Sequence, residues 1–335
     1  MTRTLCFVAP GRLEVRDGPI LELAPGMLRV QTIYSAISAG SELLVYRGLF
    51  PRETPDPHDS ISSDLRYPIA YGYACVGRVR EVSPPADPGW MDRLVFAFRP
   101  HTSQFVAAPA DLLIVPQEVS AEAAVFLPSM ETAVNLIQDG APVIGERVAV
   151  LGQGLVGLLT SALLCRMPLL SIISSDCYAA RRQASLALGL RGSLDPKAAG
   201  FKEDAESLLG GKADLTIEIS GQPEALDDAI GLTCFSGRIL LGSWYGEKPA
   251  ILALGGSFHR SRIKLIASQV STISPELSTR WDKARRFGVA WRAIAEIGPE
   301  KWISHTFPIE QADQAFELLD RRPADALQVV LTYGQ

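Results

Sequence analysis

The chain has 335 residues, more than one ordinary hydrophobic core contains, and fits two domains of about 150 residues each. Hydrophobic residues make up 47% and charged residues 21% of the chain, so we expect a packed globular protein rather than a disordered one. The net charge of -5 argues against nucleic acid or an anionic membrane surface as the main partner.

The five cysteines are scattered and include no Cys-x-x-Cys pair, so the sequence predicts neither a disulfide framework nor a cysteine-rich zinc site. The apolar run at the N-terminus is too short for a signal peptide and is broken by Pro10 and Gly11. We therefore expect a cytoplasmic protein. The uncharged stretch 148–165 reaches the lower limit for a membrane-spanning helix, but its early glycines favour a buried strand, turn and helix.

The first part of the chain is predicted to be rich in strands. Short apolar or alternating runs at 28–35, 76–82 and 93–98 indicate strands. The polar, Pro-rich segment 51–63 between them is typical of a surface loop. From Ser120, a residue type common at helix N-caps, a helical pattern continues toward residue 138.

Strand and helix signals then alternate, a pattern typical of parallel βαβ units with helices on both faces of a sheet. Strands are predicted at 147–151, 170–175, 214–219, 237–242 and 263–268, and helices at 155–166, 179–188 and 223–233. A long amphipathic helix over 276–297 and a closing strand over 326–333 follow. The sequence therefore predicts a β-rich domain made of 1–120 and 269–335, with an α/β domain inserted at 121–268.

The segment 152–157, GQGLVG, follows the predicted strand 147–151 and opens the next predicted helix. In a G-x-G-x-x-G turn the first glycine allows the tight bend, the second lets a pyrophosphate approach the backbone, and the third lets helix and strand pack closely. The helix N-terminus then presents free N–H groups to the phosphates. This context predicts a Rossmann dinucleotide site.

Asp176 lies 19 residues after Gly157, at the end of the next predicted strand. A carboxylate there accepts hydrogen bonds from the ribose hydroxyls and repels a 2'-phosphate, so we expect NAD rather than NADP as the cofactor. Arg181 and Arg182 follow closely and are able to bind a phosphate. The expected cofactor-binding residues are Gly152, Gly154, Leu155, Val156, Gly157, Asp176, Arg181, Thr132, Ser220, Gly242, Ser243 and Ser268.

Further segments match a known pattern: 38–42 (SAGSE), 72–77 (GYACVG), 127–133, 219–221 (ISG), 237–242 (GRILLG) and 307–316 (FPIEQADQAF). With these and the glycine motif, the chain resembles the medium-chain dehydrogenase/reductase superfamily, which is alcohol dehydrogenase-like, over essentially its whole length. The resemblance implies an α/β fold, a Rossmann doubly wound parallel sheet inserted into a GroES-like β-rich catalytic domain. It also implies a homodimer formed through the edge of the nucleotide-domain sheet.

Zinc-dependent members of that superfamily carry a ligating Cys in the first segment, a His-Glu pair in the second and a Cys or acid near the third. Here Ser38, Tyr73-Ala74 and the region of Pro128 hold those places. Hydroxyl groups are poor Zn²⁺ ligands beside thiolates and imidazoles. The four cysteines of a structural zinc lobe are also missing near 90–110. We therefore expect a zinc-independent oxidoreductase with no metal site.

Several segments resemble one branch of the superfamily in particular: 37–42, 72–73, 100–107, 242–246, 258–260, 268–270 and 280–282. They are similar to the bacteriochlorophyllide a dehydrogenase branch, whose members oxidise a hydroxyethyl group on a chlorin ring with NAD⁺. Ala74 departs from the Glu often found after that tyrosine. Because the branch contains many relatives of unassigned substrate, the resemblance implies a subfamily rather than a substrate.

Without a metal, a hydrogen-bond donor must polarise the substrate oxygen. Tyr73 stands where the histidine ligand is lost, so the resemblance implies that it is this donor; otherwise its ring only fills space. Ser41 aligns with the hydroxyl that relays a proton in alcohol dehydrogenases; otherwise it is a turn serine. His101 is a further candidate acid or base, and Glu131 is a candidate near the nicotinamide; the alternatives are surface or structural roles.

The predicted helix 276–297 carries Trp281, Arg285, Arg286 and Trp291. These side chains are either a substrate-binding patch or, as we expect, aromatics packed on the β-rich domain beside solvated arginines.

The leading functional hypothesis is an NAD(H)-dependent, zinc-independent oxidoreductase that interconverts a secondary alcohol and a ketone on a sizeable small-molecule substrate. The loop 51–66 is expected to shape the substrate entrance. One alternative is an NAD(P)H-dependent reductase of activated C=C bonds, like the enoyl and quinone reductases. Another is a non-catalytic dinucleotide-binding protein that keeps the cofactor site and lacks the proton relay.

Overall fold

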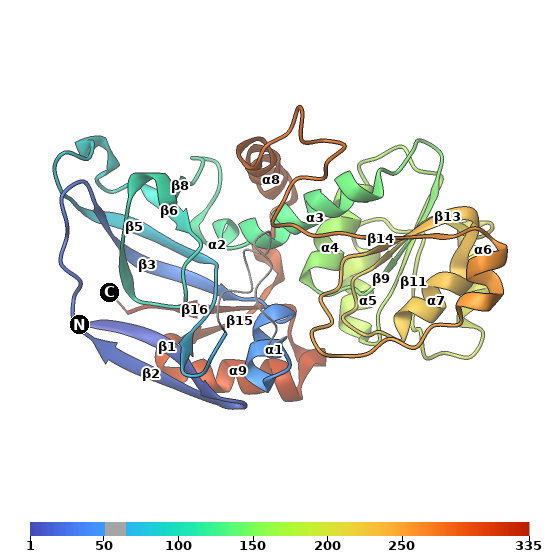
Figure 1. Cartoon of the computed structure of the whole chain (residues 1–335), viewed down its shortest axis with the longest axis horizontal. Coiled ribbons are helices and arrows are strands. Elements are labelled where there is room, and N and C mark those ends of the chain that lie inside the picture. Colours follow the sequence, from blue (N-terminus) through green and yellow to red (C-terminus); the bar gives the residue numbers. More distant parts are fainter. Residues whose placement is uncertain (51–64, 335) are drawn as a thin grey trace. The chain divides into compact units, whose positions relative to one another are not determined.

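The computed structural model describes residues 1–50 and 65–334, so the predicted loop 51–63 lies outside the described residues. The chain forms two compact units, which are visible in Figure 1. The β-rich unit contains the described residues up to Pro128 together with those from Trp291 onward, and the α/β unit contains Ser129–Ala290. The β-rich unit is therefore built from segments that are far apart in the sequence.

Antiparallel strands dominate the β-rich unit. Its strands are β1 (Thr2–Ala9), β2 (Arg12–Gly18), β3 (Leu28–Ile37), β4 (Ile69–Ala70), β5 (Cys75–Val82), β6 (Leu94–Ala97), β7 (Gln104–Ala107), β8 (Leu113–Ile114), β15 (Ile303–Pro308) and β16 (Gln328–Thr332). Its helices are α1 (Ser41–Arg47), α2 (Ala121–Ala124) and α9 (Ala312–Arg321). One sheet has the order β2-β1-β4 and a larger one the order β15-β16-β3-β5-β6-β8, with β7 also paired to β3.

Alternation along β3 and β5 builds a core for this unit. Leu28 and Val30 of β3 and Cys75 and Val79 of β5 are completely buried in one apolar cluster. Because successive side chains of a strand point to opposite faces, the same alternation leaves polar residues on the other face. The closing strand β16 pairs antiparallel with β3, which fixes the end of the chain to its beginning.

The α/β unit contains a six-stranded sheet in which every pairing is parallel. Its strands are β9 (Arg147–Leu151), β10 (Ser171–Ser175), β11 (Gly192–Leu194), β12 (Ala213–Glu218), β13 (Thr233–Leu241) and β14 (Lys264–Ala267). Its helices include α4 (Leu155–Leu164), α5 (Ala179–Leu186), α6 (Phe201–Leu209) and α7 (Ala225–Leu232). The order β11-β10-β9-β12-β13-β14 is that of a doubly wound Rossmann sheet, as predicted.

Each face of this sheet has its own apolar core. Val148 and Val150 of β9 belong to a cluster that also includes Leu164 of α4. Ala149 and Leu151 of the same strand belong to a second cluster, which contains residues of α6 and α7. The strand is buried on both faces, which explains its continuous apolar sequence. Its carboxyl end, at Leu151, leads directly into the glycine motif.

Two predicted helices differ from the structure by more than two residues at an end or by being divided. The helical pattern after Ser120 is divided between α2 and α3 (Leu127–Gly140), although the Ser120 hydroxyl caps α2 by accepting a hydrogen bond from the Ala123 N–H, as expected. The helix predicted over 276–297 begins only at Lys283, as α8 (Lys283–Ile297). Asp282 accepts a hydrogen bond from the Arg285 N–H at 2.7 Å, so it acts as the N-cap and the residues before it form turns.

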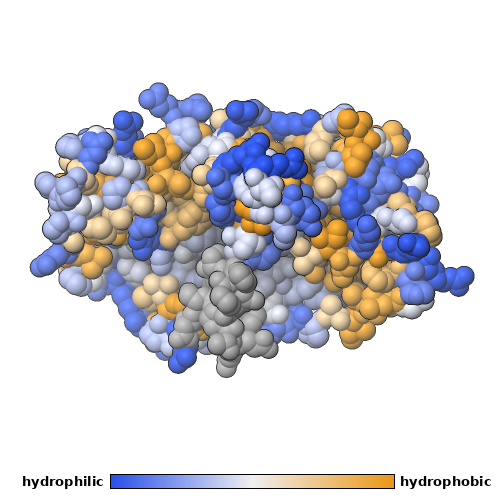
Figure 2. All heavy atoms as spheres, turned by 45° about the horizontal axis from the view of Figure 1, so that its top comes forward, coloured by the Kyte–Doolittle hydropathy of each residue, from blue (hydrophilic) through white to orange (hydrophobic). Residues whose placement is uncertain are grey.

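Among the described residues, no helix is long and apolar enough to cross a membrane. Hydrophilic and apolar side chains are interspersed on the face of the molecule drawn in Figure 2.

Candidate functional site

The glycine motif forms a tight turn between β9 and α4. Gly152 has a φ of 101°, a left-handed value that favours glycine, and a side chain there would lie 2.6 Å from the Cα atom of Ser220. A side chain at Gly157 would overlap the carbonyl oxygen of Gly152. A side chain at Gly154 would have only one neighbour within 4 Å, the Arg181 guanidinium at 3.9 Å. The first and third glycines are thus required for packing, and the second leaves the backbone accessible.

Helix α4 begins without a side-chain cap, because Gly154 is its N-cap residue. Leu155 and Val156 in its first turn are half-buried. The unpaired N–H groups and the dipole of a helix start favour an anion such as a phosphate. The turn and the helix start therefore fit the pyrophosphate of a dinucleotide.

Asp176 connects this turn to the end of β10. One of its carboxylate oxygens accepts a hydrogen bond from the Gln153 N–H at 2.8 Å, and the other accepts one from the Tyr178 N–H at 2.8 Å. Arg181 lies 3.8 Å from the same carboxylate and stacks on the Tyr178 ring at 4.8 Å. A carboxylate and a guanidinium thus lie together beside the glycine turn.

A buried carboxylate that the sequence analysis did not select organises the other side of the turn. Glu218, the last residue of β12, is completely buried and accepts hydrogen bonds from the Ser220 N–H at 2.8 Å and the Tyr245 hydroxyl at 2.6 Å. Burial and the negative charge of Glu218 raise the pKa of Tyr245. The Ser243 hydroxyl accepts a hydrogen bond from the Gly221 N–H at 2.9 Å. An acidic residue inside an otherwise apolar strand was the available sequence signal.

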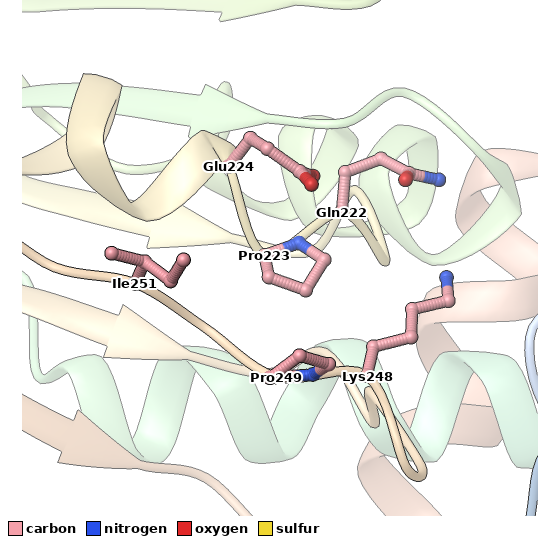
Figure 3. Close-up of a pocket in the computed structure, with 6 residues that line it drawn as sticks. All are labelled: Gln222, Pro223, Glu224, Lys248, Pro249 and Ile251. Carbon is pink, nitrogen blue, oxygen red and sulfur yellow. The ribbon is translucent and has the colours of Figure 1, made fainter.

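A pocket of about 400 Å³ lies between the loops that follow β12 and β13. Figure 3 shows its lining residues, Gln222, Pro223 and Glu224 from one loop and Lys248, Pro249 and Ile251 from the other. The Lys248 ammonium donates a hydrogen bond to the Gly221 carbonyl oxygen at 2.8 Å, which ties the two loops together. None of these lining residues was selected from the sequence, since they belong to no motif.

Two predicted cofactor residues have structural contacts of their own. A side chain at Gly242 would lie 2.5 Å from Leu136, so this glycine allows close packing of the strand end. The Ser268 hydroxyl donates to Asp139 at 2.6 Å and accepts from Asn135 at 2.9 Å. Burial raises the pKa of Asp139. Thr132, in α3, is half-buried.

Glu131 is buried and paired with cations, so it is not a helix-surface acid. Its carboxylate accepts hydrogen bonds from Lys283 and, at 2.9 Å, from the Arg286 guanidinium. Arg286 is completely buried and also donates to the carbonyl oxygens of Val270 and Thr272. The expectation that this arginine is solvated was therefore wrong, because the sequence did not show its distant partner.

Of the two tryptophans in the segment 276–297, only Trp291 is seen, among the described residues, to pack on another aromatic ring of the β-rich unit, as expected. Trp291 is buried and packs edge-on against Phe96 of β6, with ring centroids 6.4 Å apart. Trp281 instead stacks with the Arg285 guanidinium at 4.1 Å. Arg285, unlike Arg286, is exposed.

The β-rich unit brings Tyr73 and Ser41 together. The Tyr73 hydroxyl lies 3.2 Å from the Ser41 hydroxyl, although the two residues are 32 positions apart in the chain. Burial and the neighbouring negative charge of Glu42 raise the pKa of Tyr73 to about 12, so its hydroxyl is protonated at neutral pH. A protonated phenol beside a second hydroxyl can donate a hydrogen bond to a substrate oxygen.

His101 is not a surface residue. Its side chain is completely buried, and its Nε2 atom lies 2.8 Å from the Glu42 carboxylate, which is also completely buried. Its Nδ1 atom lies 2.7 Å from the Ser35 hydroxyl. Both ring nitrogens are thus occupied within the protein. In the described part of the chain, no three His, Cys, Asp or Glu side chains come together in a way that could hold a metal ion.

No family model matches the chain. Among curated proteins, it is 24% identical to sorbitol dehydrogenase from Pongo abelii over 61% of this chain and 54% of that protein. It is also 24% identical to the starvation-sensing protein RspB from Escherichia coli, over 70% of this chain and 66% of that protein. The match to the Pongo abelii enzyme thus spans little more than half the length of that relative.

Solved structures resemble the whole chain. An alcohol dehydrogenase from Escherichia coli in complex with NADH has a TM-score of 0.80 at 18% identity, and 2R,3R-butanediol dehydrogenase from Bacillus subtilis has 0.81 at 17%; each covers 99% of both chains. A protein from Sinorhizobium meliloti described as a zinc-binding dehydrogenase, bound to NADP, has 0.78 at 17%, again over 99% of both chains. The chain therefore has the alcohol dehydrogenase-like fold, with its Rossmann sheet inserted into a GroES-like part, as predicted.

Replacing Gly157 with alanine is expected to weaken NADH binding at least about tenfold, because the added methyl group overlaps the Gly152 carbonyl and distorts the turn. Titration of NADH fluorescence measures the effect. Gly288→Ala in α8 is the matched control, since its methyl group meets nothing within 4 Å. A folded Gly157→Ala protein with wild-type affinity for NADH would contradict the assignment of the turn.

Proposed function

We propose that the protein is an NAD(H)-dependent oxidoreductase that interconverts a secondary alcohol and a ketone without zinc. The observation that carries this proposal is the contact between Asp176 and the glycine turn, because it combines an accessible backbone, a helix start and a carboxylate in one site. The similarity to sorbitol dehydrogenases and to the fold of butanediol dehydrogenase supports an alcohol or polyol as the general substrate class.

In this proposal the residues of the α/β unit hold the cofactor. The N-terminus of α4 binds the pyrophosphate, and Asp176 accepts hydrogen bonds from the adenosine ribose. Arg181 adds a positive charge beside the phosphates. The nicotinamide, when bound, accepts or supplies the hydride. The preference for NAD rests on the negative charge of Asp176, since similar folds are known with NADH and with NADP.

The hydroxyl pair of the β-rich unit is proposed to manage the proton. Tyr73 donates a hydrogen bond to the substrate oxygen and stabilises the negative charge that develops there. Ser41, 3.2 Å from that hydroxyl, passes the proton to or from it. His101 and Glu131 are placed outside this chemistry, because their polar atoms are engaged within the protein.

Zinc independence is proposed from the chemistry of the side chains at the places of the expected ligands. Ser38, Tyr73 and Ala74 offer hydroxyl groups or a methyl group, which are weak or useless ligands for Zn²⁺. Two better donors of the same unit, His101 and Glu42, are bonded to each other. The bacteriochlorophyllide a dehydrogenase branch therefore remains the proposed subfamily, with a sizeable substrate.

The domain boundaries and the assembly belong to the same proposal. A catalytic domain of 1–120 and 269–335 flanks a nucleotide domain of 121–268 in the sequence, whereas the compact units of the structure divide after Pro128 and after Ala290. A homodimer would form along the free edge of β14, which pairs only with β13 among the described strands.

Wild-type protein is expected to bind NADH more tightly than NADPH, and Asp176→Asn to reduce that preference about tenfold or more, because it removes the charge that repels a 2'-phosphate. The amide keeps an oxygen that can accept from the Gln153 N–H. Fluorescence titrations with both cofactors measure the ratio. Asp195→Asn, which alters the carboxylate 3.3 Å from Arg182, is the control. Equal affinities in the wild-type protein would refute the preference.

Tyr73→Phe is expected to lower kcat by roughly 10²- to 10⁴-fold, since it removes the proposed donor, and Ser41→Ala to lower it less. Steady-state kinetics with NADH and a ketone measure both effects. Tyr34→Phe, which removes a hydroxyl bonded to Glu122 at 2.8 Å, is expected to keep wild-type turnover. Unaltered turnover in the Tyr73/Ser41 double variant would exclude this assignment.

The reaction class is tested with metal-stripped protein, NADH and one unsaturated ketone that offers both a C=O and a C=C bond. The expected product, identified by mass and NMR, is the allylic alcohol at the same rate as before chelation. Restoration of lost activity by Zn²⁺ would overturn zinc independence. A saturated ketone would favour the enoyl and quinone reductases, and no turnover with any ketone would favour a non-catalytic dinucleotide-binding protein.

A further inference from the structure

A chain of buried polar groups lies in the core of the β-rich unit. The His101 Nδ1 atom is 2.7 Å from the Ser35 hydroxyl, which is 2.6 Å from the Tyr333 hydroxyl. The His101 Nε2 atom is 2.8 Å from the Glu42 carboxylate, and both of these side chains are completely buried. Burying ionisable groups costs free energy even when they are paired. The fold's stability alone therefore gives no reason for the pair.

The imidazole of His101 contacts the chain neighbours of both Tyr73 and Ser41: the Gly72 backbone and the Glu42 carboxylate. A side chain at Gly72 would lie 2.7 Å from the His101 Cδ2 atom, so the ring lies directly against the residue that precedes Tyr73. Gly72 itself has a φ of 122°, a value that other residues rarely adopt. The other edge of the ring is bonded to Glu42, the residue that follows Ser41.

Glu42 extends this contact to a third segment. Its second carboxylate oxygen accepts a hydrogen bond from the Ser38 N–H at 2.9 Å. The segment before α1, the first turn of α1 and the segment before β5 are thus joined through one imidazole and one carboxylate. These are the segments that carry Ser38, Ser41 and Tyr73.

The carboxylate also acts electrostatically on Tyr73. Its negative charge adds to burial in raising the pKa of Tyr73. The other titratable groups affected by Glu42 are Cys75 and Tyr333, whose pKa values burial also raises. The remaining aromatic neighbour of Tyr73 is Tyr71, whose ring packs edge-on against it at 6.3 Å. With the imidazole proton on Nε2, His101 donates to Glu42 and accepts from Ser35. Each of the four buried polar side chains, Glu42, His101, Ser35 and Tyr333, then has a hydrogen-bond partner.

We propose that His101 and Glu42 are positioning residues: they hold the segments of Tyr73 and Ser41 in place, so that the two hydroxyls lie against each other. The inference rests on the proposed function, in which Tyr73 is the donor to the substrate oxygen. It assigns a role to a buried pair that itself touches neither substrate nor cofactor. It also gives a reason for the complete burial of His101, a candidate acid or base in the sequence.

The first test measures the ionisation of Tyr73 without reference to activity. Tyrosinate absorbance is followed against pH, and the curve of the same protein carrying Tyr73→Phe is subtracted to isolate this residue. Glu42→Gln keeps the shape of the side chain and removes its charge, so Tyr73 is expected to ionise at lower pH. Glu122→Gln, which removes the carboxylate beside Tyr34, is the matched control and is expected to leave the Tyr73 curve unchanged.

The second test separates positioning from general stability. Glu42→Gln and His101→Gln are expected to lower kcat about tenfold or more while the KM for NADH stays unchanged, because no dinucleotide contact is altered. Glu42→Asp, which restores the charge, is expected to return the Tyr73 curve toward that of the wild type. If Glu42→Gln does not fold, His101→Gln carries the test, and wild-type kcat in that folded variant would overturn the proposal.

Different results would contradict the role of the His101–Glu42 pair and the role of Tyr73 as the donor. An unchanged Tyr73 curve in folded Glu42→Gln protein overturns the inference. A shifted curve together with wild-type turnover in Tyr73→Phe supports the inference about the pair and rejects Tyr73 as the donor.

Discussion

The hydrogen bond from the Gln153 N–H to the Asp176 carboxylate is the contact on which the α/β unit's candidate site depends. It joins the turn after β9 to the end of β10, and the Gly152 N–H reinforces the junction by donating to the Ser175 carbonyl. On the other side, the same turn lies directly against Ser220, which follows β12. Three adjacent strand ends therefore meet at one backbone bend, and neither Gly152 nor Gly157 has space for a side chain.

The loops and hydroxyl groups of the candidate sites also depend on two buried carboxylates. Glu218 orders the loops after β12 and β13, and Glu42 lies beside the hydroxyl groups of the β-rich unit. Both carboxylates lack solvent contact: Glu218 accepts from N–H and O–H donors, and Glu42 is bonded to the Ser38 N–H and the His101 Nε2 atom. Such an arrangement fixes the donors in position, because each would lose a strong hydrogen bond by moving. The buried carboxylates thus hold these loop groups by hydrogen bonds, which apolar side chains in the same places could not form.

The sequence predicted the parts that local patterns determine. The strand 147–151 was placed to the residue, since a continuous apolar run followed by glycines has few other interpretations. The alternation of strands and helices predicted the parallel sheet, although β11 and α6 were not identified, because their weaker patterns gave no clear signal. The medium-chain dehydrogenase resemblance then predicted the β-rich unit that local patterns described only in part. The start of α8 was wrong by several residues, because the turn-forming segment before Asp282 looks helical until its cap is recognised.

The burial of Arg286 could not be predicted in this way, and it has a consequence for how the sequence can change. Arg286 and its partner Glu131 are separated by 155 positions, so no window along the chain contains both. Loss of Glu131 would leave the buried Arg286 guanidinium without its carboxylate partner, and loss of Arg286 would leave Glu131 paired with Lys283 alone, whereas replacing both with apolar residues of similar volume is often tolerated. Since Arg286 also donates to the Val270 and Thr272 carbonyl oxygens after β14, such a double change would still remove one hydrogen bond from each, and Val270 would keep the one from Lys283. Divergence at these positions is therefore expected to be concerted: related chains should keep the arginine and the glutamate together or rebuild the segment 268–272 along with them.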